Sequence, residues 1–185
     1  MEKVITVLLV FSIGLGTQLR AQGKTYSKKS VKKEIMLPDF DKIEVYGLAQ
    51  VYLSEGSKPY ARLEVSGMPM DEVIVKVENR TLKISTPGNY SGESVKIYIT
   101  YKEVNKLLVT DAAEIFSETP IRTSTLEISA LDAGNAVLEI NVNLVKIRMA
   151  DSADLTLTGH AKKQKILSNS KSGTFTNSGL LIDDH

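Results

Sequence analysis

The sequence predicts an all-β protein in which antiparallel strands in the first half lead into a right-handed parallel β-helix-like solenoid. Three observations support this fold. Apolar and polar residues alternate from Ile43 onward, which is the period of a half-buried strand. No stretch after the N-terminus shows apolar positions at helical spacing over three turns. A unit marked by an acidic or polar residue and small neighbours recurs every 19–21 residues in the second half.

The first residues have the layout of a signal peptide. Lys3 precedes the apolar run from Val4 to Leu15, and a small-residue exit ends at Ala21. We expect residues 1–21 to be removed and the mature chain to be exported to the periplasm, the cell surface or the medium. The apolar run is too short for a membrane-spanning helix, which needs about 20 such residues. The sequence has no cysteine, so we expect neither disulfides nor thiolate metal sites.

Beyond the signal peptide, the chain is expected to form one domain. Residues 22–34 form a basic, flexible segment, and residues 35–185 form a single β domain with repeated coils over about 104–179. The formal net charge is only +1, which argues against a nucleic-acid partner. The basic segment could attract an anionic lipid or glycan surface, although a solvated tether is the stronger interpretation of such a run.

The first half is predicted to consist of antiparallel hairpins. Turn-forming residues at 54–59, 78–81 and 87–92 separate segments rich in Val, Ile and Tyr. The alternation marks strands within Ile43 to Leu53, Ala61 to Val65, Val73 to Val77, Leu82 to Ile84 and Val95 to Ile99.

The second half repeats one unit. Its corners are Asp111-Ala112-Ala113, Asp132-Ala133-Gly134 and Asp151-Ser152-Ala153, with a weaker copy at Ser170. A unit this short cannot bury its own apolar face, so copies must stack and share a core. We therefore expect side chains such as Ile128 and Ile147 to lie above one another at the strand spacing of ~4.8 Å.

Several segments together resemble a known family. They are the stretch from Phe40 to Gly47, the hairpin around Asn79 to Ile84, the strand Val95 to Tyr101 and the corners with small residues. This pattern resembles the putative auto-transporter adhesin, head GIN domain family, from Phe40 to about Gly179. The resemblance implies an exported protein of the Bacteroidetes type, with a β-helix-like fold and no established activity. The usual Ser-Gly-Ala corner of the family is replaced here by the Asp-containing corners.

The corner acids Asp111, Asp132 and Asp151 are the candidate metal ligands. If the coils stack, their carboxylates align, and hard oxygen ligands at that spacing could bind Ca²⁺. A structural role in the turns is the stronger interpretation, because aspartate is common in solvated turns. We predict no other cofactor. A polysaccharide lyase would also need a base, for which Lys146 or Arg148 is available in the neighbouring strand.

Three tyrosines, Tyr46, Tyr52 and Tyr98, are the candidate ligand-binding residues. They lie on the polar side of predicted strands, and flat aromatic rings can stack on sugars. The absence of Trp and the preference of Tyr for strands favour a structural role instead. His160 follows a glycine and is expected to be an exposed turn residue.

The sequence contains no coherent catalytic set, so the leading hypothesis is a non-enzymatic cell-envelope or secreted binding protein. The hypothesis is adhesin-like binding of an unidentified glycan or protein surface. Two alternatives stay open, a β-helix polysaccharide lyase or hydrolase and a purely structural envelope subunit. The apolar run Leu180-Leu181-Ile182 is expected either to cap the last coil or to join a second copy of the chain.

Overall fold

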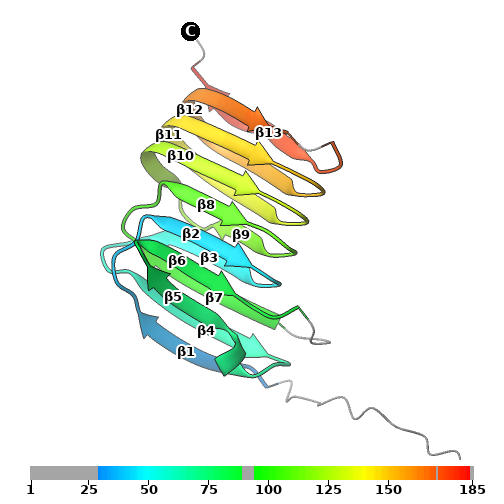
Figure 1. The fold of residues 1–185 in the computed structure, drawn as a ribbon. Helices are drawn as coiled ribbons and strands as arrows, with labels where there is room; N and C mark the ends of the chain where they lie inside the picture. Colours follow the sequence, from blue (N-terminus) through cyan, green and yellow to red (C-terminus); the bar gives the residue numbers. More distant parts are fainter. Residues whose placement is uncertain (1–28, 89–93, 170, 184–185) are drawn as a thin grey trace, which may run out of the picture.

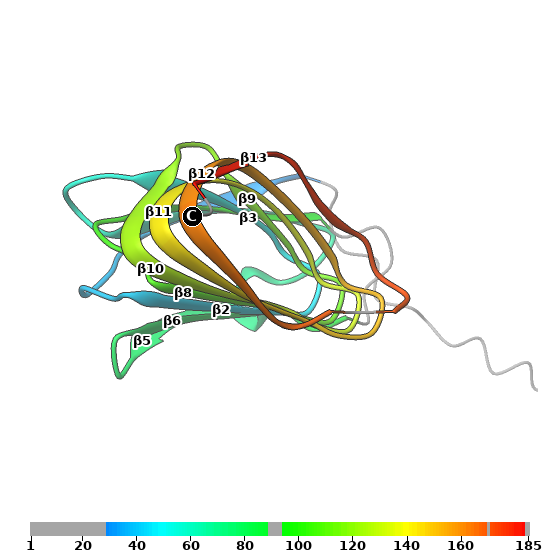
Figure 2. The same ribbon diagram turned by 90° about the horizontal axis from the view of Figure 1, so that it is seen from above.

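A computed structural model describes residues 29–88, 94–169 and 171–183. These residues form one 13-stranded mixed sheet that curls into a flattened coil (Figures 1 and 2), with a single 3₁₀ turn, η1 (Met70–Glu72). The strands are β1 (Val31–Met36), β2 (Lys42–Tyr46), β3 (Gln50–Glu55), β4 (Tyr60–Ser66), β5 (Ile74–Glu78), β6 (Thr81–Ser85), β7 (Ser94–Tyr101), β8 (Lys106–Val109), β9 (Glu114–Ser117), β10 (Ile121–Ala130), β11 (Asn135–Met149), β12 (Asp154–Ser168) and β13 (Phe175–Ile182). The predicted all-β class is confirmed.

The second half is a stack of parallel strands. Ile147 of β11 lies opposite Ile128 of β10 and Ile166 of β12, so one circuit of the chain takes 19 residues. The circuit from β8 to β10 takes 21, with Leu107 opposite Ile128. These registers equal the spacing of the repeated corners. The right-handed β-helix assignment stays a prediction.

The first half contains the antiparallel pairings of the molecule, but fewer hairpins than predicted. β5 and β6 form the expected hairpin, and β4 pairs antiparallel with β1 and β7. β2 and β3, in contrast, pair in parallel with β6 and β8 and with β7 and β9. The hairpin prediction was wrong for these two strands, because alternation identifies a half-buried strand but not its partner or direction.

The core lies inside the coil and is built from aliphatic columns. Ile43, Leu107, Ile128 and Ile147 occupy one column on β2, β8, β10 and β11, and none is more than 1% exposed. Figure 2 shows β3 and β9 along one side of the flattened coil, with β2, β6 and β8 along the other. Alternate residues of each strand point outward, so both sides present regular outer faces.

The corners of the coil have a shared backbone conformation. Asp111, Asp132 and Asp151 have φ values of 60°, 56° and 55°, and Gly47 occupies the corresponding place below them with φ 91°. The Ala133 N–H donates to the Asp111 carbonyl at 2.8 Å, which continues the strand ladder through the corner. Aspartate and glycine suit this left-handed conformation, since larger side chains rarely adopt it.

The two ends of the chain differ from their predictions in detail. Residues 31–34 of the basic segment lie in β1, so the expected flexibility does not apply to them. Residues 1–21, the predicted signal peptide, and residues 22–28 lie outside the described residues. At the other end, β13 continues the stack by pairing with β12, which buries Leu180 to 8% exposure while Leu181 is 70% exposed. Within the described ranges, no helix is long and apolar enough to span a membrane.

Candidate functional site

Three aromatic side chains stack in a line on the outer face of the β3 side. The Tyr52 ring lies 5.0 Å from the Tyr98 ring and 5.3 Å from the Phe116 ring, with interplanar angles of 17° and 21°. The parallel register produces this line, because Tyr52 lies opposite Tyr98 of β7 and opposite Phe116 of β9. We call these three residues the aromatic ladder.

The aromatic ladder is extended at both ends. Arg62 of β4 lies opposite Tyr98, and its guanidinium carbon is 4.2 Å from the ring centroid, a cation–π geometry. At the other end, Val137 of β11 lies opposite Phe116 and is 39% exposed. A continuous row of outward side chains therefore crosses five strands, from β4 to β11.

The stacking determines which parts of the aromatic ladder a partner could contact. All three rings are half-buried, and each ring covers a face of its neighbour. The exposed parts are therefore ring edges and the phenol hydroxyls of Tyr52 and Tyr98. Such a row can make apolar contacts and hydrogen bonds with an elongated partner lying across the strands.

The third candidate tyrosine is not part of the aromatic ladder. Tyr46 lies on β2, and its hydroxyl donates to the Glu44 carboxylate at 3.1 Å. Burial, and then the Glu44 contact, raise the pKa of Tyr46 above its ordinary value. Sequence reasoning missed Phe116 and Arg62, because the pairings that bring them to Tyr52 and Tyr98 join distant parts of the chain.

The corner acids make contacts between neighbouring circuits. The Gly47 N–H donates to the Asp111 carboxylate at 2.8 Å, and the Thr110 hydroxyl donates to the Asp132 carboxylate. Within the part of the chain that the structure describes, no group of three or more His, Asp or Glu side chains is placed to hold a metal ion. These contacts show that Asp111 and Asp132 join neighbouring circuits, and Ca²⁺ binding at the corner acids stays a prediction.

The basic and histidine candidates also have defined surroundings. The Lys146 ammonium lies 3.0 Å from the Glu127 carboxylate, and Arg148 is exposed on the same face.

His160 lies within β12 rather than in a turn, and its Nε2 is 2.9 Å from a carboxylate oxygen of Asp183. The prediction of an exposed turn residue was wrong, because Gly159 sits inside the strand with φ 97° and does not end it.

Solved structures with the same fold are known. The chain is similar to a putative adhesin from Bacteroides fragilis, at 18% identity and a TM-score of 0.74, over 85% of this chain and 74% of that one. A putative adhesin from Parabacteroides distasonis has 18% identity and a TM-score of 0.69, over 83% and 75%. A putative lipid binding protein from the same species has 18% identity and a TM-score of 0.62, with the same coverage.

Comparison at the sequence level identifies the family. No curated protein matches the chain. The profile of the putative auto-transporter adhesin, head GIN domain, matches residues 39–185, which include every strand from β2 to β13 and the whole aromatic ladder. The chain therefore belongs to the putative auto-transporter adhesin, head GIN domain family.

Proposed function

We propose that this protein is an exported, non-enzymatic, adhesin-like binding protein whose outer sheet face contacts an elongated glycan or protein surface. The observation that carries the proposal is the aromatic ladder, in which Tyr98, Tyr52 and Phe116 stack on three adjacent strands. Family membership and the names of the structural neighbours agree with a binding role. The layout of residues 1–21 supports export.

The rigidity of the stack favours binding by a preformed surface. Each ladder residue belongs to a strand that is hydrogen-bonded on both sides, and neighbouring rings restrict one another. A partner would therefore order few side chains on binding, which lowers the entropic cost of association. The hydroxyls of Tyr52 and Tyr98 would supply hydrogen bonds along its length.

The experiment is a screen of the mature protein on glycan and extracellular-matrix arrays. The proposal predicts binding to at least one class of elongated ligand. Uniformly negative arrays would contradict the binding function and favour a structural envelope subunit. A parallel incubation with uronate polymers and Ca²⁺ tests the lyase alternative, and unsaturated products lost in Asp132→Ala or Asp151→Ala would establish an enzyme.

A further inference from the structure

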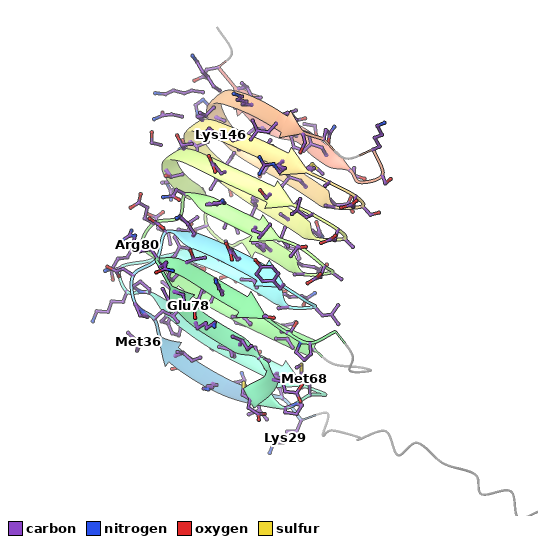
Figure 3. All side chains as sticks on the ribbon, viewed as in Figure 1. Lys29, Met36, Met68, Glu78, Arg80 and Lys146 are labelled. Carbon is purple, nitrogen blue, oxygen red and sulfur yellow. The ribbon has the colours of Figure 1, made fainter. Side chains whose placement is uncertain are left out.

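Four lysines and one glutamate form a single column on the outer face opposite the aromatic ladder. Lys42 of β2 lies opposite Lys106 of β8, which lies opposite Glu127 of β10. Glu127 lies opposite Lys146 of β11, and Lys146 lies opposite Lys165 of β12. The column crosses five adjacent strands, a length of roughly 19 Å. Figure 3 shows Lys146 on the upper strands, apart from Glu78 at the end of β5 and Arg80 in the turn that follows it.

This column follows a surface groove. One hollow is lined by Lys106, Glu127, Lys146, Arg148 and Lys165, among others. A second hollow is lined by Lys42, Glu103, Lys106 and Glu127 together with polar residues. The two hollows share Lys106 and Glu127, so they join into one cationic groove that runs across the strands.

The charges of the cationic groove are poorly balanced by the protein itself. Lys146 forms an ion pair with Glu127 at 3.0 Å, whereas Lys42, Lys106, Arg148 and Lys165 form none among the described residues. Lys42 and Lys106 lie about one strand spacing apart, as do Lys146 and Lys165, and the two cations of each pair repel each other. A bound anion would relieve this repulsion.

We infer that the cationic groove binds a strand of acidic polysaccharide, a polymer with carboxylates or sulfates on a hydroxyl-rich chain. This inference rests on the proposed binding function and names a ligand class and a second site for it. The line of cations suits a linear polyanion. Glu127, held in the middle of the line, can accept hydrogen bonds from sugar hydroxyls between the charged groups.

Other polyanions fit the cationic groove less well. Polyphosphate carries a charge on every unit and would place one beside the Glu127 carboxylate, whereas an acidic polysaccharide can place hydroxyls there. The hydrogen bond from Lys146 lowers the pKa of Glu127. Neither hollow is lined by an aromatic residue on which nucleic-acid bases could stack. The cations form a line rather than a broad plane, which is a poor match for a lipid surface.

The test is isothermal titration of the mature protein with oligogalacturonate, with a neutral malto-oligosaccharide, polyphosphate and phosphatidylglycerol vesicles as comparisons. Changing Lys106 and Lys165 together to Gln is expected to weaken oligogalacturonate binding about tenfold or more. The matched control changes Lys33 and Lys58 to Gln, which removes the same charge from exposed positions that line neither hollow and should alter affinity less than about twofold. Glu127→Gln should strengthen polyphosphate binding more than oligogalacturonate binding.

Three results would overturn the inference. They are no binding of oligogalacturonate, equal weakening by the groove and control pairs, and groove-dependent binding of polyphosphate or vesicles that is as tight as that of oligogalacturonate. A ladder variant, Tyr52→Thr with Tyr98→Thr, should still bind oligogalacturonate. Positive arrays for the wild type together with a failed groove test would remove only this inference and leave the proposed function in place.

Discussion

Ile128 lies directly opposite Ile147 in the parallel pairing of β10 and β11, with both side chains buried in the core of the coil. Replacing either residue with Asp should unfold the domain. A carboxylate there would be buried without a partner, which costs several kcal/mol, comparable with the total stability of about 5–15 kcal/mol for a domain. Thermal unfolding followed by circular dichroism measures the effect. Asn141→Asp places the same charge at an exposed position of β11 and should change the stability little. Equal stability of all three variants would mean that this column is not the core.

Gly47 packs closely against Thr86 in the corner between β2 and β3. A Cβ added at Gly47 would lie 2.1 Å from the Thr86 carbonyl oxygen, and the φ of 91° is strained for any side chain. Gly47→Ala should therefore lower the free energy of unfolding by about 2 kcal/mol or more. At Gly88 the nearest atom to an added Cβ is 4.0 Å away, so Gly88→Ala should change stability by less than about 1 kcal/mol. Urea denaturation measures the free energy of unfolding of both variants. An unchanged value for Gly47→Ala would contradict the close packing at this corner.

Tyr101 should make the protein sensitive to alkali. Burial raises the pKa of Tyr101 to about 12, above the value of 10 expected for an exposed tyrosine. The neutral phenol therefore stabilises the folded state fully below pH 10, and this stabilisation is lost as the pH rises from 10 to about 12. Tyr101→Phe should reduce the loss of stability in this window. Denaturant unfolding at several pH values provides the measurement, and an identical alkaline profile for the variant would contradict the prediction.

The last strand should protect the end of the stack. Residues 180–182 pair with Gly159, His160 and Ala161 of β12, so a chain that ends at Gly179 leaves this edge unpaired. We expect the full-length mature protein to be monomeric and the shortened one to aggregate in light scattering. A full-length dimer that becomes a monomer on truncation would instead assign β13 to an interface between copies. Unchanged mass and stability would contradict both roles.

The sequence was most informative where a local pattern has a direct structural cause. The corners at Asp111, Asp132 and Asp151 predicted the circuit length, because each circuit must turn at the same place in the stack. The alternation from Ile43 predicted which residues are buried, since successive side chains of a strand point to opposite faces.

The pairing partners of the first half could not be predicted in the same way. β3 pairs with β9 through residues such as Tyr52 and Phe116, which are far apart in the sequence, and Tyr52 lies outside the visible repeat. Two of the three candidate tyrosines meet. Phe116 joins them only through the β3–β9 pairing, and Arg62 only through the β4–β7 pairing. The cationic groove could not be predicted from the sequence for the same reason, because its lysines come from four separate strands.

The aromatic ladder is tested most directly by repeating the array screen with matched tyrosine variants. Tyr52→Thr combined with Tyr98→Thr removes two of its three rings and keeps residue types that suit strands. Tyr46→Thr removes a half-buried tyrosine on the other side of the coil and serves as the control. For ligands that still bind the Lys106→Gln, Lys165→Gln protein, we predict that the double tyrosine variant loses binding while its circular dichroism spectrum stays that of the folded protein. Tyr46→Thr should still bind the same ligands. Full binding by the folded double variant to a ligand that also binds the Lys106→Gln, Lys165→Gln protein would contradict this prediction.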